Sequence, residues 1–212
     1  SQQIEGHVSI TASDILSAYL LPPIVARLRQ SHPGIVVEIV ASNAIRDLTR
    51  READIAIRHL RPDQPDLIAR HVGQGSARPY ASTAYLDRHG RPSGPADLAR
   101  MALIGFDRDG VLLNHLTAAG LPIGEANFRS CSSNGIVAWH LLLQGLGIAV
   151  MPCDLADATP GVEPVLPDMA PFDYPIWLVT HRELHTSRRI RLTFDHLARS
   201  LRAGAAMAAA QV

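Results

Sequence analysis

The sequence predicts an α/β fold of two lobes joined by two crossing segments. Its 212 residues suffice for two lobes of about 100 residues each. Short apolar runs alternate with amphipathic stretches along the first third of the chain, and the alternation resumes after a proline-rich loop. We therefore expect Rossmann-like lobes with mixed, mainly parallel sheets and right-handed crossovers.

In the first lobe, residues 7–11 predict a strand. The long helix that follows carries Leu16, Leu20, Ile24 and Leu28 on one stripe, and Thr11 or Ser13 caps it. Because proline lacks an N–H group, Pro22 and Pro23 predict a kink or a broken turn in this helix. The predicted elements that follow are a buried strand at 35–42, a helix at 44–52, and strands at 53–58 and 67–73.

The second lobe repeats this alternation from about residue 82 to residue 171. Helices are predicted at 83–90, 94–101, 111–120 and 135–144, and strands at 102–106, 126–131 and 148–151. A strand at 173–181 and a helix at 187–201, with the stripe Ile190, Phe194, Leu197 and Leu201, return the chain to the first lobe. The predicted domains are lobe I (1–75 plus 174–203), lobe II (76–173) and a frayed, alanine-rich tail (204–212).

The segment "SSNGIVAWHLLLQGLGIAVMP" has glycines that resemble a nucleotide-binding loop. Such a loop runs from strand through glycines to helix, whereas here a helix precedes the glycines and a strand follows them. Gly145 fits a left-handed position at the helix end, and Gly147 permits a tight turn. We therefore predict no nucleotide cofactor at this segment.

Composition excludes several classes of function. The net charge is +0 with scattered basic residues, so this chain alone is not expected to bind nucleic acid. No apolar run approaches the roughly 18 residues of a membrane span, and the N-terminal residues do not read as a signal peptide. The sequence holds no lysine, which excludes Schiff-base, pyridoxal phosphate and Walker-lysine chemistry.

Titratable side chains do not form a recognisable centre in the sequence. Cys131 and Cys153 make no metal motif and are expected to be buried free thiols of a cytoplasmic protein, with a redox pair as the alternative. His181, His185 and His196 lack further ligands at matching spacing, so they predict solvated histidines rather than a zinc site. No catalytic acid–base set stands out, and we expect no metal, no cofactor and no enzymatic activity.

Three phrases closely resemble the effector-binding domain of LysR-type transcriptional regulators: "HPGIVVEIVASNAIRDLTRREADIAIRH", "ASTAYLDRHGRPSGPADL" and "LLLQGLGIAVMP". The resemblance extends from about residue 6 to residue 201. It implies a type 2 periplasmic-binding-protein-like fold, an effector bound between the lobes, and homodimers, or tetramers of the full-length protein, that pair through residues 15–29 and 35–41. It also implies that DNA is bound only by an N-terminal winged helix-turn-helix, which this chain lacks.

The resemblance places the binding cleft at four segments, and polar groups follow the predicted strands there, where parallel α/β sheets bind ligands. Thr11 and Ser13 either hold a carboxylate or merely cap the first helix, and Arg58 clamps an acid, is solvated or bridges the domains. The full predicted effector site is Thr11, Ser13, Ser42, Asn43, Arg58, Phe106, Ser133 and Asn134. For Asn43, Ser133 and Asn134 the alternative is capping of the next helix, and for Phe106 the alternative is a place in the hydrophobic core.

These observations predict an allosteric sensor of a small metabolite, with a carboxylate as the preferred class, acting on an absent DNA-binding domain. A periplasmic solute receptor of a transport system is the alternative, because it shares the fold but requires export. An enzyme is the third hypothesis.

Overall fold

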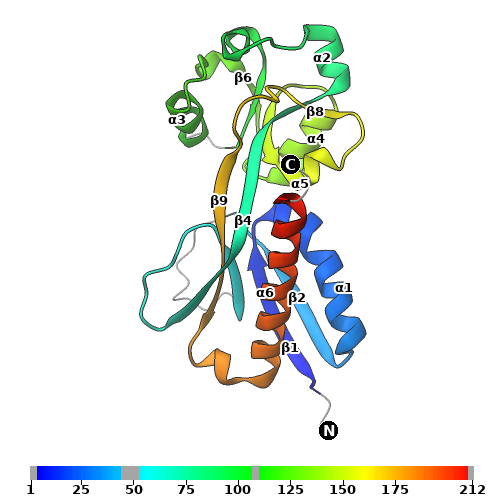
Figure 1. Ribbon diagram of the computed structural model, residues 1–212, viewed down its shortest axis with the longest axis vertical. Helices are drawn as coiled ribbons and strands as arrows, with labels where there is room; N and C mark the ends of the chain where they lie inside the picture. The colour runs from blue at the N-terminus through cyan, green and yellow to red at the C-terminus, as the bar shows by residue number, and fades with distance from the viewer. Residues whose placement is uncertain (1–3, 44–52, 107–109, 210–212) are drawn as a thin grey trace. The chain divides into compact units, whose positions relative to one another are not determined.

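The computed structural model describes residues 4–43, 53–106 and 110–209 (Figure 1). Within it the chain divides into two compact units, Ser1–Gly75 with Tyr174–Val212, and Ser76–Asp173. We call them unit 1 and unit 2. The chain passes from one to the other within two strands, β4 (Leu67–Ser82) and β9 (Phe172–His181). The helix predicted at 44–52 lies outside the described residues.

Unit 1 contains a mixed sheet in the strand order β2-β1-β3-β9-β4. Strand β1 (Gly6–Ala12) pairs in parallel with both β2 (Ile35–Ala41) and β3 (Ile55–Arg58), as the alternation of strands and helices predicted. Strand β9 pairs with β3 in the antiparallel direction, with Ile55 opposite Thr180. The sheet is therefore mixed because the return strand enters from the opposite end.

Strand β2 differs from the prediction of a buried strand. Only Ile35 at its start is fully buried, and Val36 is 59% exposed. The physical reason is the place of β2 at the end of the strand order, where it pairs with β1 alone. An apolar run such as "IVVEIVA" does not reveal whether a strand is central or at an edge.

The first helix contains the predicted irregularity, but before the prolines rather than at them. A π-helical turn, η1 (Leu16–Leu20), leads directly into α1 (Leu21–Ser31), whose first turn contains both prolines. The Leu21 N–H donates to the carbonyl of Leu16, five residues earlier. Because Pro22 and Pro23 have no N–H to donate, the wider turn admits their rings without breaking the helix.

The last helix, α6 (Arg188–Ala209), packs against α1 and β1 in unit 1. Its predicted stripe is confirmed, since each member is at most 3% exposed: Ile190, Phe194, Leu197 and Leu201. The helix continues to Ala209 and so includes most of the tail that was predicted to fray. Alanine has the highest helix propensity of all residues, which favours this continuation. A short helix η5 (Leu184–Thr186) connects β9 to α6.

Unit 2 combines short helices with two strand groups. Strand β5 (Leu103–Gly105) pairs in parallel with β6 (Phe128–Cys131), while β7 (Ala149–Pro152) and β8 (Val162–Pro164) pair antiparallel with the end of β4. The helices are α2 (Thr83–His89), η3 (Pro95–Arg100), α3 (Val111–Ala118), η4 (Glu125–Asn127), α4 (Gly135–Leu143) and α5 (Cys153–Asp157). Helix α5 and strand β8 were not predicted, because elements of five and three residues are too short for a periodic pattern.

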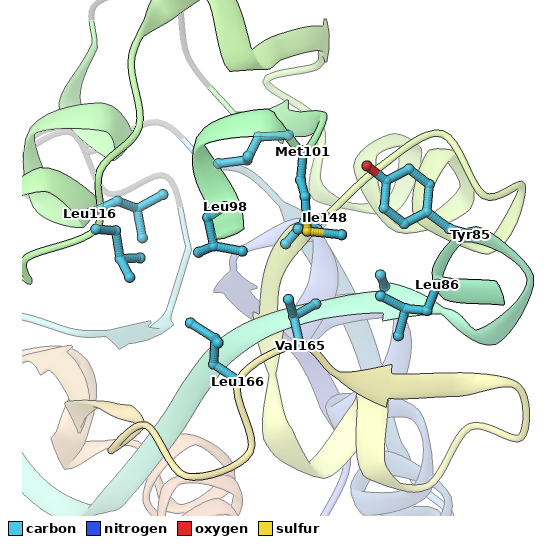
Figure 2. Close-up of a cluster of buried hydrophobic side chains, with 11 residues drawn as sticks. Tyr85, Leu86, Leu98, Met101, Leu116, Ile148, Val165 and Leu166 are labelled. Carbon is cyan, nitrogen blue, oxygen red and sulfur yellow. The ribbon is translucent and has the colours of Figure 1, made fainter. Parts of the chain in front are cut away.

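A hydrophobic cluster joins these elements of unit 2 (Figure 2). It takes side chains from α2, η3, β5 and α3, and from the segment that follows β8. The residues labelled in Figure 2 are Tyr85, Leu86, Leu98, Met101, Leu116, Ile148, Val165 and Leu166. The cluster anchors β5, whose carboxyl end carries part of the predicted site.

The glycines after α4 turn the chain, as predicted. The Gly145 N–H donates to the Leu142 carbonyl at 2.8 Å, and the Leu146 N–H donates to the Leu141 carbonyl at 3.2 Å. This pair of bonds is a Schellman motif, and Gly145 takes the left-handed φ of 73° that it requires. The motif ends α4 and directs the chain into β7.

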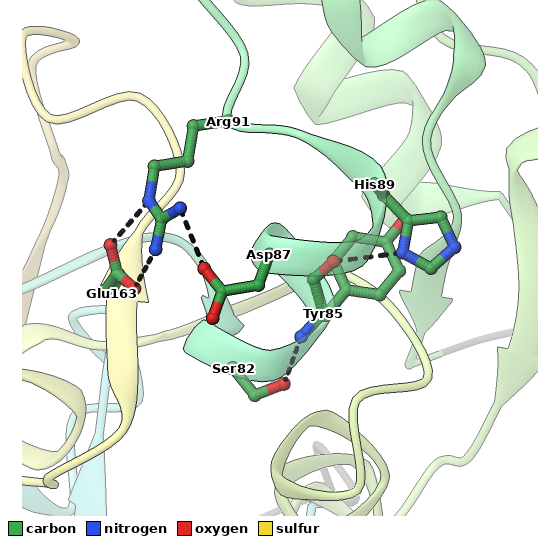
Figure 3. A network of polar contacts seen from close by, with 6 residues as sticks. All are labelled: Ser82, Tyr85, Asp87, His89, Arg91 and Glu163. Atoms are coloured by element: carbon green, nitrogen blue, oxygen red, sulfur yellow. Dashed lines mark hydrogen bonds and ion pairs between the residues drawn. The ribbon is translucent and has the colours of Figure 1, made fainter.

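An ion-pair network on the surface of unit 2 joins the end of α2 to β8 (Figure 3). Arg91 donates to both carboxylate oxygens of Glu163, at 3.1 and 2.9 Å, and contacts Asp87 at 2.9 Å. The hydrogen bonds from Arg91 are the largest of the effects that hold the pKa of the Glu163 carboxyl below its usual value, followed by one from Thr83.

We expect this network to add a pH-dependent contribution to the stability of unit 2. Because folding lowers the pKa of Glu163, the contribution is complete above the unfolded value of 4.5 and is lost as the pH falls through the folded value. Urea unfolding midpoints measured between pH 6 and pH 3 should fall less steeply for Glu163→Gln than for the wild type. The exposed Asp168 gives a control, Asp168→Asn, that should keep the wild-type slope.

Candidate functional site

Three parallel strands of unit 1 end at one edge of the sheet. Ala12 lies opposite Ala41, and Thr11 lies opposite both Val40 and Ala56. This register brings five of the predicted site residues to the carboxyl edge: Thr11, Ser13, Ser42, Asn43 and Arg58. Thr11 is only 3% exposed, whereas Asn43 is exposed. The predicted polar residues of this unit therefore share one edge.

A pair of hydrogen bonds fixes Asn43 at this edge. Its Nδ2 donates to Asp14 Oδ2 at 2.7 Å, and its Oδ1 accepts from the Asp14 backbone N–H at 3.0 Å. The other carboxylate oxygen of Asp14 accepts from the Ile15 N–H at 2.7 Å. Asp14 is 7% exposed and was not among the predicted site residues. Sequence reasoning missed the pairing because the two residues lie 29 positions apart.

Ser13 rather than Thr11 takes the capping position of the first helix. Its Oγ lies 3.4 Å from the Leu16 N–H, and its carbonyl accepts from the Ser17 N–H at 2.8 Å. Ser17 in turn donates from Oγ to the Ala12 carbonyl at 3.3 Å. The hydroxyls of Ser13 and Ser17 thus bond to the backbone at the junction of β1 and the helix.

Arg58 ends β3 in a half-buried position, where its Nη1 donates to the Ile57 carbonyl at 3.1 Å. The next residue, His59, packs edge-on against Tyr174 at 4.8 Å and bonds through Nδ1 to the Pro175 carbonyl at 3.2 Å. Burial lowers the pKa of His59, and the positive charge of Arg58 lowers it further. The net lowering of its pKa, against the raising effect of the Pro175 hydrogen bond, favours the neutral form of His59 beside Arg58.

The second group of predicted residues meets at the carboxyl edge of β5 and β6 in unit 2. Gly105 lies opposite Cys131, and the Ser132 N–H donates to the Gly105 carbonyl at 2.9 Å. Phe106 follows β5 in a half-buried position, while Ser133 and Asn134 follow β6 and are exposed. The structure thus brings these three residues together within unit 2.

Asn134 caps helix α4. Its Oδ1 accepts from the Val137 N–H at 3.1 Å, and its own N–H donates to Ser132 Oγ at the same distance. The positive end of the α4 dipole therefore lies at the same edge as Ser133. Capping does not exclude binding, because further N–H groups of a first helical turn point out of the helix.

The cysteines and histidines depart from their predicted environments. Cys131 is exposed and Cys153 half-buried, although both were expected to be buried. Cys131 ends β6, a strand that pairs with β5 alone, so an apolar strand does not enclose it. The three histidines are packed rather than solvated: His181 is 8% exposed, His185 lies edge-on to Phe194 at 5.4 Å, and His196 bonds to the Ile24 carbonyl at 3.1 Å.

Within residues 4–43, 53–106 and 110–209, no three histidine, cysteine or acidic side chains are grouped as metal ligands would be. No helix in this described part combines the length and hydropathy of a membrane span. The polar groups at the two edges are hydroxyl, amide and guanidinium groups and, at Asp14, a carboxylate that already bonds to Asn43. Such groups bind polar ligands by hydrogen bonds and charge.

Comparisons with known proteins agree with this description. Residues 1–202 match the family model of the LysR substrate binding domain. The HTH-type transcriptional regulator CrgA of Neisseria meningitidis serogroup B is 28% identical over 203 residues, covering 93% of this chain and 68% of that protein.

Solved structures show the same fold. The regulatory domain of CrgA, a LysR-type transcriptional regulator from Neisseria meningitidis, has a TM-score of 0.82 at 25% identity, covering 93% of this chain and all of that domain. The AmpR effector binding domain from Citrobacter freundii has a TM-score of 0.75 at 16% identity, and the match covers 93% of this chain and 98% of that domain. The fold is therefore the type 2 periplasmic-binding-protein-like α/β fold, as predicted.

That fold and the polar strand ends are those of a ligand-binding domain. The chain belongs to the LysR substrate-binding domain family, as the effector-binding domain of a LysR-type transcriptional regulator.

Proposed function

We propose that a small metabolite carrying a carboxylate is the effector and that the predicted site residues at the carboxyl edge of each unit are its binding residues. The observation that carries the proposal is the gathering of all eight predicted site residues at these edges: Thr11, Ser13, Ser42, Asn43 and Arg58 in unit 1, and Phe106, Ser133 and Asn134 in unit 2. The Arg58 guanidinium and the positive start of α4 favour an anionic group.

The domain limits that we propose for this function are lobe I, residues 1–75 with 174–203, and lobe II, residues 76–173. The effector changes the equilibrium between two conformations of the domain only if it binds one conformation more tightly than the other. Coupling of roughly 1–3 kcal/mol is typical of such sensors. This energy then alters DNA binding by a winged-helix domain, which is supported by the description of the relatives as HTH-type regulators.

Family membership also supports the finer proposals about this chain. Regulators of transcription act on DNA, so we propose a cytoplasmic protein without enzymatic activity rather than an exported transport receptor. We further propose a homodimer, and a tetramer of the full-length protein, formed through the first helix and β2. The exposed apolar side chains of Tyr19 and Val36, at 39% and 59%, support that surface.

Calorimetric titration with a panel of organic acids and amino acids tests the effector proposal. We expect one class of carboxylate to bind, and Arg58→Gln to weaken its binding by about tenfold because a charged hydrogen bond is lost. Asn134→Asp keeps an oxygen acceptor that caps α4 but adds a negative charge, so it should weaken a carboxylate to a similar degree.

Arg191→Gln is the matched control, because it removes an exposed arginine of α6 in unit 1 away from the strand edges. It should bind the effector as the wild type does. If no member of the panel binds, or if both site variants bind with wild-type affinity, the proposed effector site is wrong.

A further inference from the structure

A hollow of about 290 Å³ lies in the surface of unit 2, apart from the proposed effector edges. It is lined by residues of α2, of the end of η3 and the approach to β5, and of η4 and β6: Tyr85, His89, Ala99, Arg100, Met101, Ala102, Ala126, Asn127 and Arg129. Met101 and Ala102 precede β5 and Asn127 precedes β6, so the hollow lies at the amino ends of these strands. Phe106, Ser133 and Asn134 follow their carboxyl ends.

Hydrogen bonds hold the walls of this hollow in place. The Asn127 amide donates to the carbonyls of Leu98, Ala99 and Met101 at 3.1, 3.1 and 2.9 Å, and its Oδ1 accepts from the Gly124 N–H at 2.8 Å. This one side chain therefore ties η4 to the end of η3. Such a fixed wall lowers the ordering cost of binding a ligand.

The aromatic wall carries two polar groups with remaining bonding capacity. The Tyr85 hydroxyl accepts from the Ala102 N–H at 2.9 Å and still has its own proton to donate. The His89 ring stacks on Tyr85 at 4.3 Å, and its Nδ1 lies 3.0 Å from the Tyr85 carbonyl (Figure 3). Because a carbonyl oxygen only accepts, Nδ1 carries the hydrogen, and Nε2 is left as an acceptor for a hydrogen-bond donor elsewhere on the ligand.

The charge around the hollow is positive. Arg100 and Arg129 line it, and none of the lining residues is acidic. Arg100 forms an ion pair with Asp97 at 2.9 Å, which uses one of its five N–H donors. Arg129 is exposed, and its side chain makes no ion pair or hydrogen bond within the described part of the chain. Both guanidinium groups thus have N–H donors left for a ligand, and the charge of Arg129 has no acidic partner within the described residues.

We propose that this hollow is a second binding site, specific for a small oxyanion such as the carboxylate or phosphate group of a metabolite. Arg129 and Arg100 bind the oxyanion by charged hydrogen bonds, and the Tyr85 hydroxyl donates a further one. Ala99, Met101 and Ala126 provide an apolar surface for the rest of the ligand. The volume lies near the lower end of the range of about 300–1,000 Å³ of small-molecule sites.

Titration of the ¹⁵N-labelled protein with sodium phosphate and sodium acetate, compared with sodium chloride at equal ionic strength, tests this site. We expect saturable shifts of the amide signals of Ala102, Asn127 and Arg129. If both anions saturate the shifts, the hollow is a general oxyanion site. If only phosphate or only acetate does so, the hollow is specific for a phosphate or a carboxylate group. Arg129→Gln and Arg100→Gln should each weaken binding by roughly fivefold or more.

Arg191→Gln removes the same charge from an exposed position in unit 1 and should leave the affinity unchanged. Shifts that do not saturate beyond those in chloride, or an equal loss of affinity in Arg191→Gln, would overturn the proposal. All three arginines have exposed side chains, so their variants should keep the wild-type spectrum outside the mutated region. The amide signals that are followed belong to residues of the hollow, so acetate binding at the proposed effector edges would be recognised by shifts at other residues.

Discussion

Replacing Phe194 with alanine is expected to lower the free energy of unfolding by about 3–5 kcal/mol. Phe194 is fully buried on the inner stripe of α6, which packs against α1 and β1. Its ring and that of His185 form a T-shaped pair with centroids 5.4 Å apart, and the Arg70 guanidinium lies over the Phe194 ring at 5.2 Å. Truncation removes apolar contacts on several sides and leaves a cavity that the neighbours fill only in part.

Urea unfolding followed by circular dichroism measures this loss. Leu60→Ala serves as the control, because Leu60 is 71% exposed and its truncation should change the stability by less than about 0.5 kcal/mol. A loss below about 1 kcal/mol for Phe194→Ala would mean that α6 does not close the core of unit 1.

Replacing Gly147 with alanine is expected to lower the free energy of unfolding by about 3 kcal/mol. A Cβ atom at Gly147 would lie 2.7 Å from the Ala102 carbonyl oxygen, and its φ of 157° is one that other residues rarely adopt. The close approach is required because Ile148 donates to that same carbonyl at 2.9 Å, while Ile104 donates to the Ile148 carbonyl at 2.7 Å.

The effect should extend to ligand binding, because these bonds hold β5, and Phe106 follows β5. Gly94→Ala is the matched control, since nothing lies within 4 Å of a Cβ at that position and its backbone is extended. We expect it to change the stability by less than about 1 kcal/mol. Equal stabilities of the two variants, measured by thermal unfolding, would contradict the close approach at Gly147.

Local sequence patterns predicted much of the fold. The stripe of α6, the parallel pairing of β1 with β2 and β3, and the turn at Gly145 were all predicted from residues close together in the chain. In each case the pattern reflects a backbone preference or a helical period that acts over a few residues. The polar residues at the strand ends were predicted by the same reasoning, and their contact with an effector stays a prediction.

The sequence by itself thus determined the family, the α/β alternation and the strand ends at which polar residues gather. Only the tertiary structure decided that β9 runs antiparallel to β3, that β2 is exposed at an edge, and that Asp14 holds Asn43. It alone revealed the oxyanion hollow, whose lining comes from segments up to 44 positions apart, from Tyr85 to Arg129. Periodicity reports which face of an element is buried, whereas the partner of each face depends on how distant segments pack.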